Sequence, residues 1–479
     1  MKRKNFVLLP AALITIFILY SCARDYVTGK RTVSLVSESQ EIAIGRESDP
    51  QVIAEYGLYP DTELSNYVNN IGQQIATVSQ RSNLKYTFRV VDSPVVNAFA
   101  LPGGWVYFTR GILSHFNSED ELAGVMGHEI GHVVARHGAE AATRGQLAQL
   151  GLGLGSILSP EIAQMSELAA QGLGLLFLKY GRDQESESDR LGAEYSTKLG
   201  YDAHKMAGFF RTIARISEGG ERLPTFLSTH PDPGNREVRV NELAAEWQSK
   251  VPYTPKNTER SDYLRRIDGV IFGDDPRQGF VESGVFYHPE LRFQFPVPRG
   301  WFVANSPQVI QLVAPEKNAV VQMSLEKASS PREAAEIFVK NSGAQVVGSD
   351  SRPVHGLPAW RVESAVKDQN NVLHVLSYFI QKDGSIYVFH GYTPDQLFSK
   401  FAGTFESVMA GFEPLRNQAA LTKKPLRVRI ERVRQSGDLA SVLRSFKTPD
   451  DKMKELAILN GMKLEDRLAS GSLVKVVRE

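Results

Sequence analysis

The chain has 479 residues, of which 42% are hydrophobic, and its formal net charge at pH 7 is +1. This length allows two to four domains, and the balanced charge gives no reason to expect a nucleic-acid partner or an acidic substrate. Because Cys22 is the only cysteine, a disulfide framework within the chain is excluded.

The N-terminus has the pattern of a secretory signal. Three basic residues at positions 2–4 precede an apolar run over 6–20, which is shorter than a membrane-spanning helix requires. The run ends in Leu-Tyr-Ser-Cys22, which resembles a bacterial lipobox, so we predict a lipoprotein signal peptide over 1–22 and lipidation of Cys22. The alternative for Cys22 is an ordinary buried thiol. Because Ala23 follows instead of the aspartate typical of inner-membrane retention, we expect an anchor in the outer membrane, facing the periplasm.

A β-strand is predicted after a Gly-Gly turn, at Val106, Tyr107, Phe108 and Thr109. Two interpretations are open. As an edge strand it would offer unpaired backbone groups to an extended substrate peptide, whereas as an ordinary hairpin strand it would not.

The segment 118–138 is predicted to form one helix, with Ser118 and Glu121 as a capping box at its start. Three glycines lie inside it, at positions 124, 127 and 131. Each would cost about 1 kcal/mol relative to alanine in an exposed helix. We therefore expect this helix to be buried against neighbouring backbone.

On this helix His128 and His132 share one face, so both imidazoles can bind a single Zn²⁺. Glu129 follows the first histidine and is expected to lie beside the open coordination position as a general base. His137 would lie about 140° from the metal face on a continuous helix, so we interpret it as a surface or capping histidine. The motif predicts a metallopeptidase.

A zinc peptidase needs a third protein ligand. In the charged stretch 181–192, helical spacing would place Glu185 and Asp189 on one face and Glu187 nearly opposite. Glu185 is therefore the predicted third ligand, and Asp189 is placed to accept the free N–H of a ligating histidine. The alternative is a solvated acidic helix face.

Between these motifs, residues 151–180 are apolar but interrupted by Pro160 and two glutamates, so they predict two helices around the active-site cleft and no membrane span. These helices would form either a mobile lid or simple helix packing.

A linker is predicted over 251–279, followed by an α+β domain over 280–414. We predict strands at 293–295, 309–313, 320–325, 359–366, 373–381 and 385–392, and helices at 331–340 and 394–409. We expect a mostly antiparallel sheet with helices on one face. The layout resembles PsbP-like or Mog1-like domains, which implies binding or docking.

The last segment, 423–479, is predicted to run strand, helix, helix, strand, which resembles a LysM module. Peptidoglycan binding is one hypothesis for it. Protection of an exposed edge strand explains its arginines equally well.

Four motifs together resemble the gluzincin zinc peptidases that include HtpX and the CaaX prenyl endopeptidase, especially the soluble periplasmic lipoprotein branch typified by BepA and LoiP. The matching segments are 97–111, 128–132, 182–192 and 228–231 with Arg236. The resemblance implies a mainly α-helical, zincin-type peptidase domain over 23–250 with a small β-sheet. It also implies that Glu185 is the third ligand of one zinc ion and that Asp189 supports the site.

Two loop residues have roles that depend on this resemblance. His230 would be exposed in most loops of this kind, but in BepA-like relatives the matching histidine lies near the metal and can fill its open position. Arg236 would then be its partner or a substrate contact. The resemblance further implies proteolysis of misfolded or stalled envelope proteins, in contact with outer-membrane assembly machinery or peptidoglycan. The alternative is a chaperone-like assembly or docking factor with a latent protease site.

Overall fold

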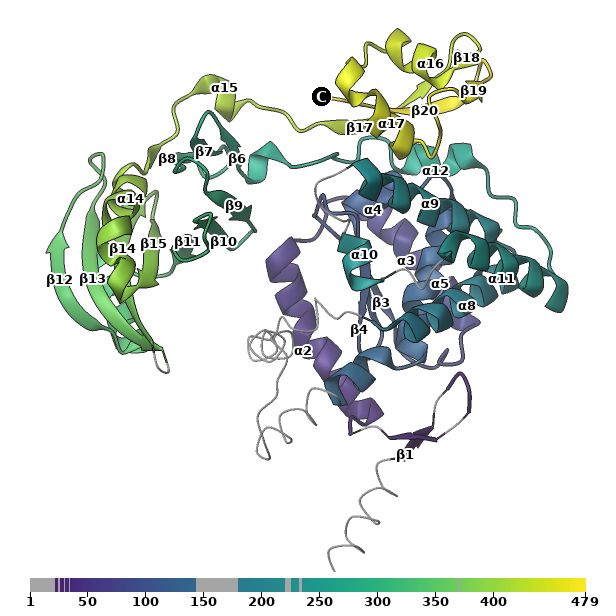
Figure 1. Cartoon of the computed structure of the whole chain (residues 1–479), viewed down its shortest axis with the longest axis horizontal. Coiled ribbons are helices and arrows are strands. Elements are labelled where there is room, and N and C mark those ends of the chain that lie inside the picture. Colours follow the sequence, from purple (N-terminus) through teal and green to yellow (C-terminus); the bar gives the residue numbers. More distant parts are fainter. Residues whose placement is uncertain are drawn as a thin grey trace, which may run out of the picture. The chain divides into compact units, whose positions relative to one another are not determined.

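The structure is a computed structural model, and it describes residues 22–24, 26–29, 31–33, 35–143, 180–219, 225–231, 235–368 and 371–479. The chain forms two compact units (Figure 1). The first contains the residues up to Ile53, then Gly57–Gly273 and Leu426–Arg478, and the second contains Asp274–Pro425 with Ala54–Tyr56 and Glu479. The predicted signal peptide and the helices expected over 151–180 lie outside the described residues, apart from Cys22 and Tyr180.

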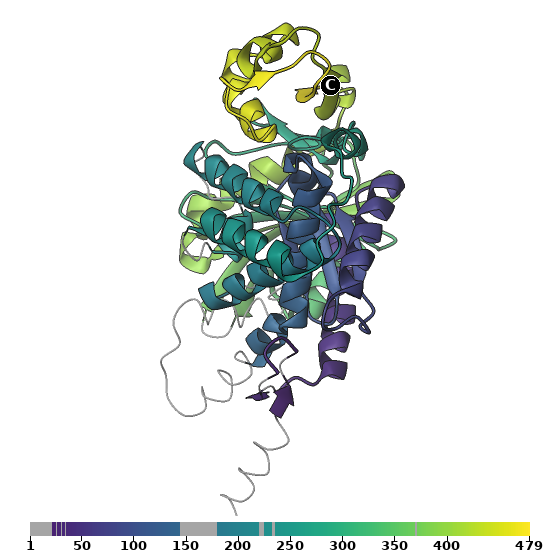
Figure 2. The same cartoon turned by 90° about the vertical axis from the view of Figure 1, so that its right-hand side faces the viewer.

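The first unit is mainly helical with a small β-sheet, as predicted. Its elements up to residue 273 are β1 (Cys22–Arg24), β2 (Arg31–Val33), α2 (Glu38–Tyr56), α3 (Thr62–Thr77), β3 (Thr87–Val91), β4 (Ala98–Leu101), β5 (Trp105–Thr109), α4 (Arg110–His115), α5 (Glu119–Val134), α8 (Arg182–Lys198), α9 (His204–Gly219), α10 (Thr225–Thr229), α11 (Arg236–Lys250) and α12 (Arg260–Arg266). Helices α5, α8, α9 and α11 lie side by side in Figure 1 and Figure 2.

Helix α5 begins at the predicted cap, where Ser118 Oγ accepts a hydrogen bond from the backbone N–H of Glu121 (3.2 Å). The reciprocal bond of the capping box is shifted by one residue, because the Glu121 carboxylate accepts from the N–H of Asn117 (2.7 Å). The helix ends at Val134, earlier than the predicted end at 138, and Arg136 adopts the left-handed conformation with φ 60°. The chain therefore turns before the helical residues 137–143.

A buried ion-pair network holds this turn. The Arg136 guanidinium donates from Nε to Glu41 Oε2 (2.8 Å), and Arg81 donates from Nη1 to Glu41 Oε1 (2.9 Å). Arg81 also donates to the carbonyl of Val133 at the end of α5 (2.9 Å) and to the half-exposed Glu38 (2.9 Å). Glu41 and Arg81 are both fully buried, so two guanidinium groups depend on one buried carboxylate.

Glycines bring α5 and α8 into close contact, as the sequence predicts. A Cβ built on Gly127 would lie 3.0 Å from the Cα of Gly192, and one on Gly131 would lie 3.2 Å from the Cα of Ser188. A side chain at either position would push the two helices apart. Because α5 carries both histidines of the motif and α8 carries Glu185, this backbone contact sets the distance between them.

The small sheet has the order β3-β5-β4, so β5 is its central strand. Val106 pairs with Phe88 of β3 in parallel and with Ala100 of β4 in antiparallel orientation. Of the two interpretations of Val106, Tyr107, Phe108 and Thr109, the edge strand is therefore wrong, and the antiparallel pairing with β4 agrees with the hairpin strand. A short apolar strand has the same pattern in both positions, because pairing depends on distant segments.

The segment expected to be a linker belongs to the core of the first unit up to residue 273. Helix α12 buries Tyr263 and Leu264, and Ile267 and Ile271 after it are also buried. The Tyr263 hydroxyl donates to the carbonyl of Leu113 (2.6 Å). The prolines and asparagine in this segment indicated a chain with many turns. Such a chain can still pack its apolar side chains into the core of a neighbouring domain.

The C-terminal segment also lies in the first unit. Its elements are β17 (Arg427–Arg432), β18 (Gly437–Asp438), α16 (Leu439–Ser445), η5 (Asp450–Lys452), α17 (Met453–Leu459), β19 (Arg467–Leu468) and β20 (Leu473–Arg478). Strands β17 and β20 pair in antiparallel orientation, so the predicted order of strand, helix, helix, strand is present. Helix α17 contacts α4 and α9.

A buried lysine joins this segment to the end of α4. Lys475 of β20 donates from Nζ to the carbonyls of Ser114 (2.8 Å), Phe116 (2.7 Å) and Leu459 (2.9 Å). Burial lowers the pKa of Lys475 well below its usual range. The carbonyls at the end of α4 thus accept hydrogen bonds from a side chain that lies near the C-terminus of the chain.

The second unit is built on a seven-stranded antiparallel sheet with the order β12-β13-β14-β15-β11-β10-β9. Its elements are η3 (Pro276–Gln278), β6 (Phe280–Glu282), β7 (Val285–His288), β8 (Phe293–Pro296), β9 (Phe302–Asn305), β10 (Val309–Val313), β11 (Val320–Glu326), α13 (Pro331–Ser342), β12 (Gln345–Ser351), β13 (Ala359–Asp368), β14 (Asn371–Lys382), β15 (Ser385–Pro394), η4 (Asp395–Leu397), α14 (Phe398–Ala410), β16 (Glu413–Pro414) and α15 (Gln418–Leu421). All six predicted strands and both predicted helices are present.

The two long helices of this unit pack on opposite faces of the sheet, which corrects the expectation of one covered face. Ala335 of α13 packs in a cluster with Phe379, whereas Phe405 of α14 packs in a cluster with Tyr378. Neighbouring residues of a strand point to opposite faces. Consecutive residues of β14, Tyr378, Phe379 and Ile380, are all buried, which is typical of a strand that is covered on both sides.

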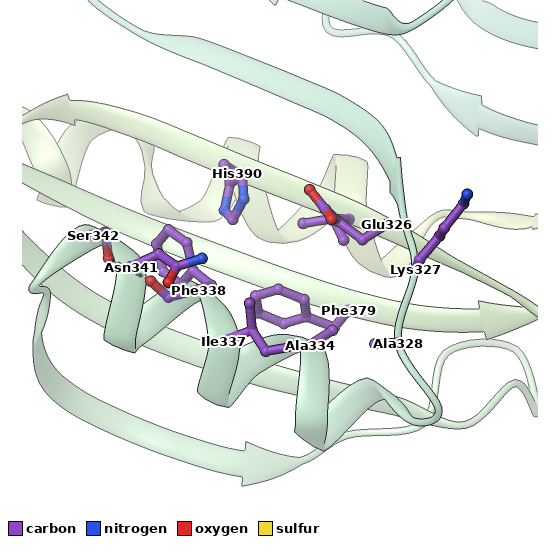
Figure 3. A pocket seen from close by; sticks show the side chains of 11 residues that line it. Glu326, Lys327, Ala328, Ala334, Ile337, Phe338, Asn341, Ser342, Phe379 and His390 are labelled. Carbon is purple, nitrogen blue, oxygen red and sulfur yellow. Dashed lines mark hydrogen bonds between the residues drawn. The ribbon is translucent and has the colours of Figure 1, made fainter.

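A pocket of about 330 Å³ lies between α13 and strands β11, β14 and β15 (Figure 3). Phe338, Phe379 and His390 form an aromatic wall, and the Phe338 and His390 ring centroids are 4.5 Å apart. Burial lowers the pKa of His390 to about 4, so this imidazole is neutral at pH 7. None of the residues predicted for catalysis lines this pocket.

No helix among the described residues combines the length and the apolar character that crossing a membrane requires.

Candidate metal centre

Three histidines and one glutamate converge in the interior of the first unit. His128, His132, Glu185 and His230 are buried, and one ligand atom of each lies within 4.8 Å of the others. Nε2 of His128 is 3.1 Å from Nε2 of His132, which is 3.4 Å from Glu185 Oε1. Nδ1 of His230 is 3.0 Å from the same carboxylate oxygen. Ligands bound tetrahedrally at about 2.0–2.1 Å from zinc lie about 3.3 Å apart, so this group suits one zinc ion.

Helical spacing supplies three members of the group. His128 and His132 lie one turn apart on α5, and Glu185 lies in the first turn of the neighbouring α8. The fourth member, His230, follows α10 and donates its backbone N–H to the carbonyl of Phe226 (2.8 Å). Its ring stacks on that of Phe226 with centroids 4.7 Å apart. The structure therefore places His230 beside the three predicted ligands, fully buried, and excludes the exposed-loop interpretation.

Asp189 lies behind His128, one turn after Glu185. Its Oδ1 is 2.9 Å from Nδ1 of His128 and 2.7 Å from Nη2 of Arg236. Arg236 also lies 3.1 Å from Glu185 Oε2, and its guanidinium packs on the ring of Phe210 at 3.9 Å. Burial raises the pKa of Asp189, but Arg236 and His128 outweigh that effect and lower it. Arg236 is thus a buried partner of two carboxylates.

The pKa shifts of Glu185 and His132 are in the direction that favours metal binding. Burial raises the pKa of Glu185, but His230, His132 and His128 outweigh it and hold that pKa well below the usual range. Burial lowers the pKa of His132 well below its usual value. A deprotonated carboxylate and a neutral imidazole are the forms that bind zinc.

Glu129 lies beside the group without a hydrogen bond to either carboxylate oxygen from any described residue. Its Oε1 is 3.6 Å from Nε2 of His230, which likewise makes no hydrogen bond within the described part of the chain. Burial raises the pKa of Glu129. Buried polar atoms without partners are costly, and a bound metal with its water would provide them. The four ligating residues and Glu129 together therefore fit a zinc site.

The sequence interpretation missed a second group of contacts, around His132. His137 is buried, and its Nδ1 lies 2.9 Å from Nδ1 of His132. Its Nε2 lies 3.3 Å from Glu187 Oε2, and the ring of Tyr180 stacks on His132 at 3.9 Å. The interpretation of His137 as a surface or capping residue is wrong, because it assumed that the helix continues past Val134. No local signal in the sequence marks the turn at Arg136.

Two predicted site features lie elsewhere. Val106, Tyr107, Phe108 and Thr109 are buried in the central strand β5, so their backbone groups already have partners on both sides. Cys22 begins strand β1, which pairs with β2. Its lipidation stays a prediction.

Residues 63–245 match the model of peptidase family M48. The chain is 31% identical over 220 residues to the putative beta-barrel assembly-enhancing protease of Vibrio cholerae, covering 44% of this chain and 46% of that protein. It is 33% identical over 233 residues to the mitochondrial metalloendopeptidase OMA1 of Schizosaccharomyces pombe, covering 47% of this chain and 67% of that protein. The chain spans about half the length of the bacterial relatives it matches.

A solved structure of cyanobacterial PsbP from Synechocystis aligns with 28% of this chain and 96% of that protein, at 16% identity and a TM-score of 0.25. This similarity does not establish a shared fold, and the PsbP-like assignment stays a prediction. The match to the yeast enzyme extends over two thirds of its length, and the M48 segment contains the entire metal group. The chain therefore belongs to peptidase family M48.

Proposed function

We propose that this protein is a zinc-dependent metalloendopeptidase. The observation that carries the proposal is the position of Glu129, a buried carboxylate without a hydrogen-bonding partner among the described residues, beside four residues that suit one zinc ion. A purely structural zinc site has no use for such a carboxylate. A hydrolytic site needs one as a general base.

In this proposal His128, His132 and Glu185 hold the zinc, and Asp189 fixes the orientation of His128. When bound, zinc supplies a Lewis acid that makes water nucleophilic near neutral pH. The Glu129 carboxylate takes a proton from the attacking water and delivers it to the amine of the leaving peptide. Arg236 balances the negative charge of Glu185 and Asp189 from the side of α11.

His230 makes the site a candidate for latency. A catalytic zinc has three protein ligands and an open position, whereas this group offers four. If His230 takes the fourth position, water and substrate reach the metal only when that side chain moves. We infer that the closed arrangement in this structure is the resting state.

Metal removal tests the proposal. Protein lacking residues 1–22 is expected to contain one zinc per chain, because the described residues contain one group of suitable ligands. Dialysis against 1,10-phenanthroline should abolish casein cleavage, and added Zn²⁺ should restore it. Zinc content by elemental mass spectrometry is the primary measurement, because a latent enzyme would show little cleavage. Purified protein that binds no zinc at pH 7 would contradict the ligand assignment.

Replacing His230 by alanine is expected to increase casein cleavage, by roughly 10-fold if about a tenth of the molecules are open at rest. Zinc content should stay at one per chain, because three ligands remain. His204→Ala is the matched control, since His204 lies in the same unit and bonds to Asn241 (2.9 Å), outside the metal group. A loss of activity in His230→Ala, with zinc retained, would instead assign His230 to substrate binding or catalysis.

For the cellular role we propose proteolytic quality control of envelope proteins, including outer-membrane proteins. The support is the similarity to bacterial relatives named beta-barrel assembly-enhancing protease. The second candidate is a chaperone-like assembly or docking factor in which proteolysis is latent. The support for it is that the buried His230 lies beside the three proposed ligands and could fill a fourth position.

Lipidation of Cys22, an outer-membrane anchor facing the periplasm and peptidoglycan binding by the LysM-like segment 423–479 belong to this proposal as predictions. The lipobox-like residues before Cys22 support the anchor. The strand, helix, helix, strand order supports the LysM-like assignment.

A further inference from the structure

The two histidines on α5 each use one ring nitrogen toward the metal group and the other away from it. Nε2 of both residues faces the group. Nδ1 of His128 faces Asp189, and Nδ1 of His132 faces Nδ1 of His137 at 2.9 Å. No other described residue forms a hydrogen bond with Nδ1 of His132. His137 therefore supplies the hydrogen-bond contact to this nitrogen, while Tyr180 stacks on the face of the His132 ring.

Donor and acceptor roles in this contact follow from the metal. An imidazole that binds zinc through Nε2 carries its proton on Nδ1, so His132 must donate to His137. Nδ1 of His137 is then the acceptor, and its own proton lies on Nε2. That nitrogen is 3.3 Å from Glu187 Oε2, which accepts the bond. A single arrangement of protons satisfies all three residues.

Two features place His137 in this position. The turn at Arg136, with φ 60°, ends α5 and directs the chain back along His132. Glu187 comes from α8, two residues after Glu185, on a face that points away from the metal. Its side chain is 27% exposed, so this carboxylate stays hydrated, whereas His137 is 3% exposed. The bond therefore links the buried ligand to a solvated charge.

A histidine at position 137 contacts His132 without adding a negative charge to the site. Glu185, Asp189 and Glu129 already place three carboxylates around the group, and Arg236 is the cation beside two of them. A carboxylate in direct contact with His132 would add a fourth negative charge to a buried site. A neutral imidazole fixes the same tautomer without that desolvation penalty.

We propose that His137 is a positioning residue of the metal centre, which together with Glu187 fixes the tautomer and ring orientation of His132. The inference rests on the proposed zinc site. Residues that orient metal ligands in this way typically affect metal affinity by about 10- to 100-fold.

The test compares zinc affinity, measured by competition with a chromogenic chelator, in the full chain from residue 23. His137→Leu removes the acceptor at similar volume and is expected to weaken zinc binding by about 10- to 100-fold. His137→Asn places its amide oxygen near the former Nδ1, so it should restore most of that affinity. His204→Leu is the control for loss of a histidine of the same unit that bonds to Asn241 outside the metal group, and it should leave the affinity unchanged.

The visible spectrum of Co²⁺-substituted protein provides a second readout, because it reports ligand geometry and not stability. His137→Leu should change the band pattern, and His137→Asn should resemble the wild type. If His137→Leu does not fold, Glu187→Ala decides the question. It should lower zinc affinity in the wild type and have no effect in the His137→Asn background, where the Nε2–H donor is missing.

The outcomes separate the two proposals. Wild-type protein that binds no zinc would overturn the metal site and the role of His137 with it. Tight zinc binding by the wild type, with equal affinity and an equal cobalt spectrum in His137→Leu, would overturn only the positioning role.

Discussion

Glu129→Gln is expected to lower the rate of casein cleavage by about 10²- to 10⁴-fold while leaving one zinc bound per chain. Glutamine has nearly the same shape but cannot accept the proton of the attacking water. The carboxylate is buried, and neither oxygen has a hydrogen bond from the described residues, so the substitution breaks no visible contact. Stability should therefore change little or increase, because burial penalises the charged form and raises the pKa of Glu129.

The measurement needs two backgrounds, the wild type and His230→Ala. If His230 restrains the wild type, a fall in activity is clearest where that restraint has been removed. Equal cleavage by Glu129→Gln and its parent in the His230→Ala background would remove the general-base role. Zinc binding with no cleavage in any background would favour the assembly or docking factor over the peptidase.

Glu41→Gln is expected to destabilise the first unit by about 3–5 kcal/mol, the range for removing one partner of a buried ion pair. Glu41 is the buried carboxylate shared by Arg81 and Arg136, and in the variant Arg136 loses this charge partner while Arg81 keeps only the more exposed Glu38. Free energies of unfolding would come from urea titration, with the transition of the first unit assigned by hydrogen exchange of α5 peptides.

Glu38→Gln is the control for this prediction. Glu38 pairs with the same Arg81 at 2.9 Å, but its side chain is 45% exposed. Exposed pairs contribute about 0.2–1 kcal/mol, so this variant should be close to wild type. Equal losses in both variants would mean that burial of Glu41 does not determine the effect.

Because Arg136 shapes the turn before His137, Glu41→Gln should also weaken zinc binding.

The parts of the site that lie on regular helices follow from the sequence. The spacing of His128 and His132 on α5, and of Glu185 and Asp189 on α8, defines which side chains share a face before any tertiary contact is known. The glycines of α5 indicated close helix packing for the same reason. Each inference needed only the helical period and the size of a side chain.

Features that depend on where an element ends or what lies beside it could not be predicted in this way. His137 reaches His132 because α5 stops at Val134 and Arg136 turns back, which requires Glu41 from a helix far away in sequence. Strand β5 is central because β3 and β4 both pair with it. In the second unit the strands were predicted from their apolar residues, but the faces covered by α13 and α14 were not, because both faces of β14 are apolar.

Lys475, which holds the segment before α5, is synthesised long after the residues of that segment that it contacts. Lys475 contacts Phe116 across 359 residues of chain, and the segment Asp274–Pro425 of the second unit lies between them. Such a non-local contact forms late, because a ribosome or export channel releases the N-terminal histidines long before residue 475. We therefore expect the segment before the helix of His128 and His132 to reach its final position only after residue 475 has been released.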